Sequence, residues 1–316
     1  MNTKLIEKPK NVKIVEITIE GEPIKKAFDE AINYFKPNIT IEGFRKGKAP
    51  NNLVRIKIDS EKLNNKVVDI ITKDFLPKVI KLHKLKPISN PKLKITKIAD
   101  TIFEGSLTFV ERPEVTLANY KKLATQAYKE AKQEQDKKDE KVKKSIKKQD
   151  GKDTKAKKKE QLSEEEHAKI HQFEHALIEK IYDLLIKESK LEIAEELIQD
   201  ETNRLISSFL GYIQRLGIKF EDYVKQTGSD IKKIQTDYRL QAERNLMVEF
   251  LLSEVVKKEE IKVTDAEIKE AIDNTPDASY KKELLKPENK YYIESQLLKQ
   301  KAVRKLLELS GFKHFH

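Results

Sequence analysis

The residues best suited to chemistry lie in one short segment, GFRKGKAP, at residues 43–50. Arginine and lysine pair with carboxylates or phosphates, and an exposed phenylalanine can fill an apolar niche on a partner. Glycine frees the backbone to turn and proline stops a helix, which predicts a loop between helices. By composition alone, a basic turn with its ring folded into the core is favoured over a docking tip for a polyanionic partner with an apolar crevice. The candidate binding residues are Gly43, Phe44, Arg45, Lys46, Gly47, Lys48 and Pro50.

Other chemistry finds little support in the sequence. His167, His171 and His175 fall at i, i+4 and i+8, a spacing at which two imidazoles can share a metal, but no HExxH motif is present and an exposed polar stripe is favoured. His314 and His316 are interpreted as tail residues. There is no cysteine, Walker loop, GxGxxG or GxSxG motif, and no paired carboxylates stand in an apolar setting. We therefore expect no catalytic residue, metal site or cofactor.

The elements around the loop predict an α+β domain over residues 1–115. Residues 12–20 are β-branched and alternating, as are 92–98 and 101–110, which predicts three strands of an antiparallel sheet. A helix is expected from Glu22 until Pro37 ends it, and Pro50 is expected as the first residue of the next helix. A long helix over residues 60–85, interrupted at Pro77, completes the pattern of helices on one face of a sheet.

A lysine-rich segment follows, and the net charge of +11 is unevenly distributed around it. Residues 129–160 hold 14 lysines and 8 acidic residues with almost nothing apolar, so we predict a solvated, flexible linker over 116–162. The alternative is a basic arm that binds nucleic acid. Residues 1–115 and 116–162 each carry a net charge of +8, whereas 163–316 carry −5. Attraction to nucleic acid is therefore expected from the first half of the chain.

Residues 163–316 predict an all-α domain with extended helical arms. A capping box at Ser163 is expected to open the first helix. Further helices are expected over 191–216, 220–226, 229–258, a short stretch from 263, and 288–309. The run from Leu246 to Val256 is apolar on most sides, which fits either an ordinary bundle core or exposed patches that hold another molecule.

Two features of the sequence predict where the protein resides. Residues 1–11 are polar and lack the apolar core of a signal peptide. No stretch approaches the roughly 20 apolar residues of a membrane helix. We therefore expect a cytoplasmic protein without a membrane partner.

Several of these segments resemble trigger factor, the bacterial ribosome-associated chaperone family. Residues 43–50 fit the family's GFRxGxxP signature at every fixed position. The resemblance covers about 1–115 and 190–316, and its other segments are AFDEA at 27–31, VERPEV at 110–115, AEELI at 194–198, NRL at 203–205, RLGI at 215–218, AERNL at 242–246 and VTDAEI at 263–268.

The resemblance implies an ATP-independent chaperone that docks at the ribosomal tunnel exit, on an exit-tunnel protein and rRNA, and shields nascent or unfolded polypeptides. Phe44, Arg45 and Lys46 match the family's ribosome-contacting tripeptide. It also implies a helical cradle for nascent chains in the C-terminal domain, and a homodimer off the ribosome is a further expected partner.

The family usually carries an FKBP-type prolyl isomerase domain where this chain has only its lysine-rich segment, so we expect no isomerase activity. The alternatives are an RNA-binding protein that uses the basic linker and an active peptidyl-prolyl isomerase.

Overall fold

The chain divides into two units, which we call the N-terminal and C-terminal units. The computed structural model describes residues 1–146, 158–228 and 230–313. For residues 138–146 and 158–166 it describes the backbone alone. The N-terminal unit comprises Met1–Glu114 with Ala194–Leu197, and the C-terminal unit comprises Val115–Ile193 with Ile198–His316. No helix among the described residues is long and apolar enough to cross a membrane.

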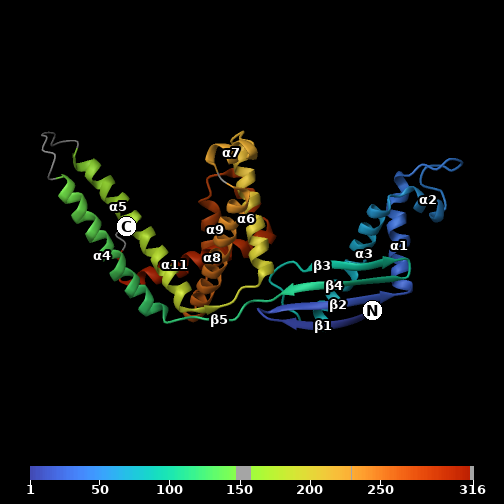
Figure 1. Ribbon diagram of the computed structural model, residues 1–316, viewed down its shortest axis with the longest axis horizontal. Helices are drawn as coiled ribbons and strands as arrows, with labels where there is room; N and C mark the ends of the chain where they lie inside the picture. Colours follow the sequence, from blue (N-terminus) through green and yellow to red (C-terminus); the bar gives the residue numbers. More distant parts are fainter. Residues whose placement is uncertain (147–157, 229, 314–316) are drawn as a thin grey trace. The chain divides into compact units, whose positions relative to one another are not determined.

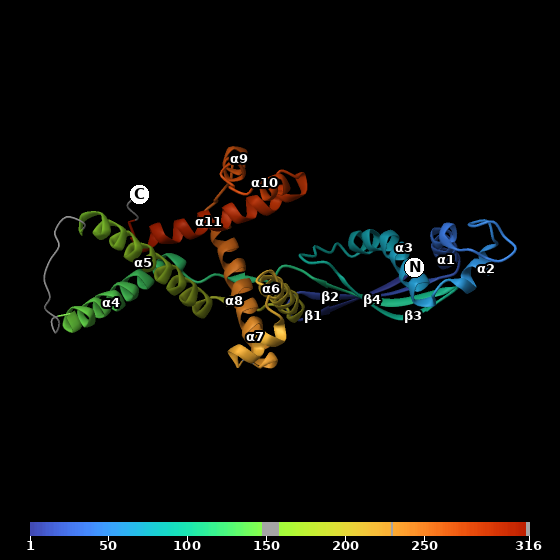
Figure 2. The same cartoon turned by 90° about the horizontal axis from the view of Figure 1, so that it is seen from above.

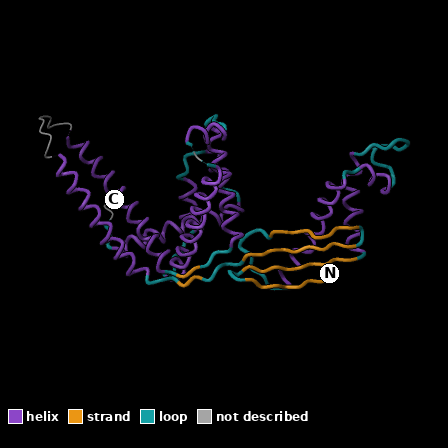
Figure 3. Tube along the Cα trace, in the orientation of Figure 1, coloured by secondary structure: helices purple, strands orange, loops and turns teal. Residues whose placement is uncertain are grey.

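The N-terminal unit is an antiparallel sheet with helices on one face (Figures 1 and 3). The strand order is β1-β2-β4-β3, and the register places Val15 of β2 opposite Leu107 of β4. The elements are β1 (Asn2–Lys8), β2 (Val12–Glu20), α1 (Glu22–Phe35), the 3-10 turn η1 (Lys36–Asn38), α2 (Asn51–Lys57), α3 (Ser60–Leu82), β3 (Lys92–Ala99) and β4 (Ile102–Val110).

Alternation along the strands builds the core of this unit. Val15, Ile17 and Ile19 of β2 point to the same face, and each is buried. They pack with the buried faces of α1 and α3 in one cluster. The predicted α+β class is confirmed, and β1 is an additional edge strand that the sequence did not predict.

Helix α3 differs from its prediction at Pro77. A proline inside a helix lacks the N–H that bonds four residues back and usually kinks or breaks the helix. Here α3 continues through Pro77 to Leu82. Because Phe75 and Val79 on either side are fully buried in the core, their packing outweighs the local cost.

The C-terminal unit is mostly helical, as predicted, with one short strand pair, β5–β6. Figure 1 shows α4 and α5 side by side as a hairpin, and Figure 2 shows the same pair crossing when seen from above. The elements are β5 (Val115–Thr116), α4 (Tyr120–Ile146), α5 (Lys158–Glu188), β6 (Lys190–Leu191), α6 (Glu195–Arg215), α7 (Phe220–Thr227), α8 (Ile231–Lys258), α9 (Asp265–Asp273), α10 (Ala278–Leu284), the 3-10 turn η2 (Pro287–Asn289) and α11 (Lys290–Ser310).

The segment 116–162, expected as a flexible linker, contains all of α4 and the start of α5. Its first half carries a buried stripe at helical spacing, which packs against α5, α8 and α11. The members of the stripe are Leu117, Tyr120, Leu123, Ala124, Ala127 and Ala131. Most of these residues precede 129, so the apolar content of 129–160, on which the prediction of a linker rested, did not include them. The part of the expected linker at 147–157 lies outside the described residues.

Two helix starts in this unit also bear on the predictions. Helix α5 begins at Lys158, so Ser163 is an interior position and the predicted capping box there is wrong. The start predicted near Thr264 is confirmed, because the Thr264 hydroxyl accepts from the Glu267 amide while the Glu267 carboxylate accepts from the Thr264 amide.

Candidate functional site

Residues 39–50 form a loop between η1 and α2, which we call the basic loop. Gly43 and Gly47 adopt φ angles of 82° and 77°, a left-handed conformation that favours glycine. Two turns shape the loop: the Phe44 amide donates to the Ile41 carbonyl at 3.1 Å, and the Lys48 amide donates to the Arg45 carbonyl at 2.9 Å. The glycines therefore fix the path of the backbone on both sides of the tripeptide from Phe44 to Lys46.

The side chains of the basic loop point mostly to solvent. Phe44 is 43% exposed, so its ring is not folded into the core. Arg45, Lys46 and Lys48 are exposed, and their side chains form no ion pair with any residue that the structure describes. Ala49 is buried and anchors the C-terminal end of the loop. An apolar ring and unpaired cations thus remain available to a partner.

Pro50 lies one position outside its predicted place. It precedes α2 as the N-cap residue, with ψ at 147°, and Asn51 is the first helical residue. The Pro50 carbonyl still accepts from the amides of Leu53 and Val54, each at 3.1 Å. All seven candidate residues therefore lie in the basic loop.

Helix α2, which follows the basic loop, is fixed to the sheet by an arginine. The two Arg55 Nη atoms donate to the two carboxylate oxygens of Asp100 at 2.9 and 2.5 Å. Asp100 lies in the turn between β3 and β4. The guanidinium carbon also lies 5.1 Å from the centre of the Phe28 ring. These hydrogen bonds lower the pKa of Asp100 and raise the pKa of Arg55. The bidentate pair sets the orientation of α2, which the sequence did not predict.

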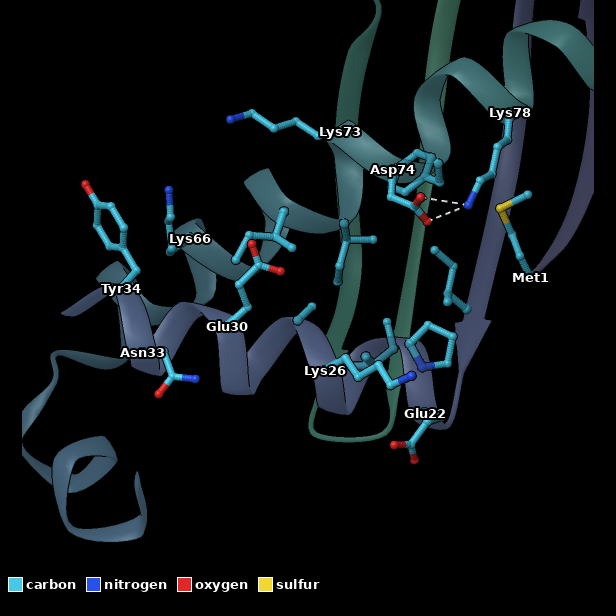
Figure 4. Close-up of a pocket in the computed structure, with 17 residues that line it drawn as sticks. Met1, Glu22, Lys26, Glu30, Asn33, Tyr34, Lys66, Lys73, Asp74 and Lys78 are labelled. Carbon is cyan, nitrogen blue, oxygen red and sulfur yellow. Dashed lines mark hydrogen bonds and ion pairs between the residues drawn. The ribbon is translucent and has the colours of Figure 1, made fainter. Parts of the chain in front are cut away.

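A pocket of about 1030 Å³ lies between α1 and α3 (Figure 4). Its floor is apolar and includes Phe75, while its rim is charged. The Lys66 ammonium lies 4.0 Å from the centre of the Tyr34 ring, and Lys78 donates to both oxygens of Asp74 at 2.7 Å. Because lysines and carboxylates share the rim, its chemistry favours no single charge class of ligand. Sequence reasoning missed this pocket because it arises from the packing of two helices.

Apolar side chains are also exposed on the C-terminal unit, but they lie outside the run 246–256, for which the sequence left both a bundle core and exposed patches open. In the run 246–256, Phe250, Leu251, Leu252 and Val255 are buried, so this run is core. The exposed side chains lie on α6, α8, α10 and α11 and next to them; Tyr291, at 80%, is the most exposed. We call this set the exposed apolar residues: Leu210, Tyr212, Leu216, Ile231, Leu240, Tyr280, Leu285, Tyr291 and Tyr292.

The three helical histidines lie along one helix in the structure. His167, His171 and His175 are exposed on α5, and the His171 Nδ1 lies 3.9 Å from a Glu174 oxygen. No group of three or more histidines, cysteines or carboxylates among the described residues could hold a metal. His314 and His316 lie outside the described residues.

Comparison with known families accounts for both units. A model described as bacterial trigger factor protein matches residues 1–149, and a model of the bacterial trigger factor C-terminus matches residues 152–308. The chain belongs to the trigger factor family. Curated trigger factors of Staphylococcus epidermidis and Staphylococcus aureus are 32% and 31% identical to it over 143 residues. Each match covers 44% of this chain and 31% of the relative, so the matched segment is about a third of each relative's length.

A solved trigger factor structure has the same fold. That structure, which concerns promiscuous substrate recognition in the folding and assembly activities of the trigger factor chaperone, superposes with a TM-score of 0.61 at 17% identity. The superposition covers 98% of this chain and 99% of the other. At this identity the likeness establishes the architecture of a trigger factor and nothing about its partners.

Proposed function

We propose that this chain is an ATP-independent chaperone that docks at the ribosomal tunnel exit through the basic loop and shields nascent polypeptides with its C-terminal unit. The observation that carries the proposal is the basic loop itself. It presents an exposed Phe44 beside cations that no described residue neutralises. A ribosome offers both complements, because rRNA phosphates and ribosomal-protein carboxylates bind arginine and lysine and a protein surface can supply an apolar niche.

The distribution of charge supports the division of labour between the units. Residues 1–115 carry a net charge of +8, which favours approach to RNA, whereas 163–316 carry −5. We propose that residues 1–115 form the ribosome-binding domain and that 163–316, packed on α4, form the chaperone domain. The lysines of 116–162 then lie beside the docking domain in sequence, where they would add to attraction to rRNA.

The exposed apolar residues support the holding of clients. Isolated exposed side chains need no explanation, but leucines and tyrosines recur along four helices of this unit. Tyrosine can contact both apolar and polar segments of an unfolded chain, which suits a surface that binds many sequences. We further propose a cytoplasmic location, and a homodimer that forms off the ribosome.

We propose that the chain lacks prolyl isomerase activity. The matched segments end at 149 and resume at 152, so two residues separate the family's N-terminal and C-terminal parts here. The test is an isomerisation assay on a proline peptide, in which clear turnover by the purified chain would overturn this proposal.

Ribosome co-sedimentation tests the docking role. The variant Phe44→Ala/Arg45→Ala/Lys46→Ala is compared with Tyr34→Ala/Lys25→Ala/Lys26→Ala, which removes one exposed aromatic ring and two cations from α1. We expect the loop variant to bind roughly 30-fold more weakly, which corresponds to a loss of about 2 kcal/mol. The α1 variant should bind within about threefold of wild type. Equal affinities of the two variants would refute docking through the loop.

Suppression of client aggregation tests the C-terminal unit separately. Replacement of Leu210, Tyr212 and Leu216 by serine in the full chain removes the exposed apolar residues of α6 and of the turn after it. We expect weaker suppression of aggregation with unchanged ribosome binding. Suppression equal to wild type would remove α6 from the holding surface.

A further inference from the structure

We infer that Lys36 and Asn51 are positioning residues, which join the two ends of the basic loop and hold its tip in the binding conformation. This inference rests on the proposed docking function of the loop. It concerns residues outside the signature segment 43–50, which only the folded structure brings together.

The joining contact is a single hydrogen bond across the base of the loop. The Lys36 ammonium donates to the Asn51 side-chain oxygen at 3.0 Å, in a part-buried setting, and the two residues are 15 positions apart in sequence. Lys36 is the first residue of η1 at the end of α1, and Asn51 is the first residue of α2. The bond therefore links the element before the loop directly to the element after it.

The backbone comes close at the same place. A Cβ atom on Gly47 would lie 3.4 Å from the Pro37 Cα and 3.7 Å from the Lys36 carbonyl oxygen. The loop thus passes against the residues that carry the joining lysine before it reaches Ala49, which is buried. Together these contacts form a narrow base, beyond which the segment from Phe44 to Lys46 projects.

The base of the loop should strengthen binding by ordering the loop in advance. A loop that is ordered before it meets its partner loses less conformational entropy on association than a loose one. A part-buried hydrogen bond of this kind contributes a factor of roughly three to ten to a conformational equilibrium. Loss of the bond should therefore weaken docking by about three- to tenfold through looser loop conformations, with no contact to the ribosome removed.

The experiment separates positioning from direct contact. In the full chain, Lys36→Met removes the donor and Asn51→Ala removes the acceptor while leaving the charge of Lys36 in place. Asn51→Asp keeps an acceptor oxygen, and adds a carboxylate that suits a helix N-terminus. Matched controls are Lys25→Met on α1 and Asn52→Ala on α2, both at exposed positions.

Two readouts are needed: the ribosome dissociation constant, and the exchange rates with water of the Phe44 and Lys48 amides measured by NMR. We expect Lys36→Met and Asn51→Ala each to raise both quantities by about three- to tenfold, and Asn51→Asp and the controls to stay within about twofold of wild type. Unchanged amide exchange in Lys36→Met and Asn51→Ala would overturn the inference. Weaker binding by Lys36→Met alone would also overturn it, because it would make Lys36 a direct ribosome contact.

Failure of the docking proposal gives a different pattern. In that case the alanine variant at Phe44, Arg45 and Lys46 would bind like wild type, while amide exchange would still report whether Lys36 and Asn51 order the loop.

Discussion

Replacing Leu123 with alanine tests whether the lysine-rich segment contributes to the folded core. Leu123 lies on α4, is 8% exposed, and packs in the cluster that includes Leu177 and Leu306. Truncation removes three carbons, which at about 0.8 kcal/mol per buried methylene amounts to about 2.4 kcal/mol. The cavity left behind adds to this loss, so we expect a destabilisation of about 3 kcal/mol.

Urea unfolding followed by circular dichroism at 222 nm measures this loss, because the mostly helical C-terminal unit dominates the signal. With a urea dependence of about 3 kcal/mol per molar for a unit of this size, the midpoint should fall by about 1 M. The matched control is Lys129→Ala, at an exposed position of the same helix, which should change stability by less than about 0.5 kcal/mol. A Leu123→Ala variant as stable as this control would show that α4 does not pack in solution.

Three further substitutions test other parts of the fold. Gly105→Ala should destabilise the N-terminal unit by roughly 2 kcal/mol, because the alanine Cβ would lie 2.8 Å from a backbone oxygen of β3. Thermal unfolding measures this loss, and a midpoint equal to that of wild type would contradict it. Gly47→Ala should cost about 1 kcal/mol and weaken ribosome binding, because φ at this position is 77°. Hydrogen bonds from Lys301 and Thr264 lower the pKa of Glu267 from 4.5 to about 2. The contribution of Glu267 to stability is therefore complete above pH 4.5 and is lost as the pH falls toward 2. NMR titration should show a higher pKa for Glu267 in Lys301→Met than in wild type, and equal values would refute this cause.

Strands and helices with a strong local signal were predictable from the sequence. The expected strand at 12–20 coincides with β2, and α1 begins at Glu22 as expected, because β-branched alternation and prolines act within a few residues. Strand β1 was missed because its two apolar residues, Leu5 and Ile6, are adjacent and do not alternate with polar ones. It forms because a neighbouring strand offers unpaired backbone groups, which no local pattern reveals.

The candidate site shows the same division between local and distant determinants. Two glycines and a proline around Phe44 predicted a loop between helices, and the structure has a loop there, with left-handed φ angles at Gly43 and Gly47. The bond between Lys36 and Asn51 could not be predicted, because nothing in the identity of a lysine and an asparagine 15 positions apart indicates that they meet. The packing of α4 into the core also could not be predicted from the sequence, because its buried positions are largely alanines, which carry little hydropathic signal.

The position of the lysine-rich segment gives a physical reason why this chain can carry both family parts without an intervening domain. The junction between the two family models, residues 150–151, falls between α4, which ends at Ile146, and α5, which begins at Lys158. The described side chains that pack this hairpin into the core lie at its opposite end, at 117–131 and 173–185. A domain present at the junction would therefore displace none of these core side chains, and a chain without one leaves none of them without its partners. The two family parts are thus separable in the packing of this fold, and helices α4, α5, α8 and α11 supply all the buried side chains of this cluster except Leu117.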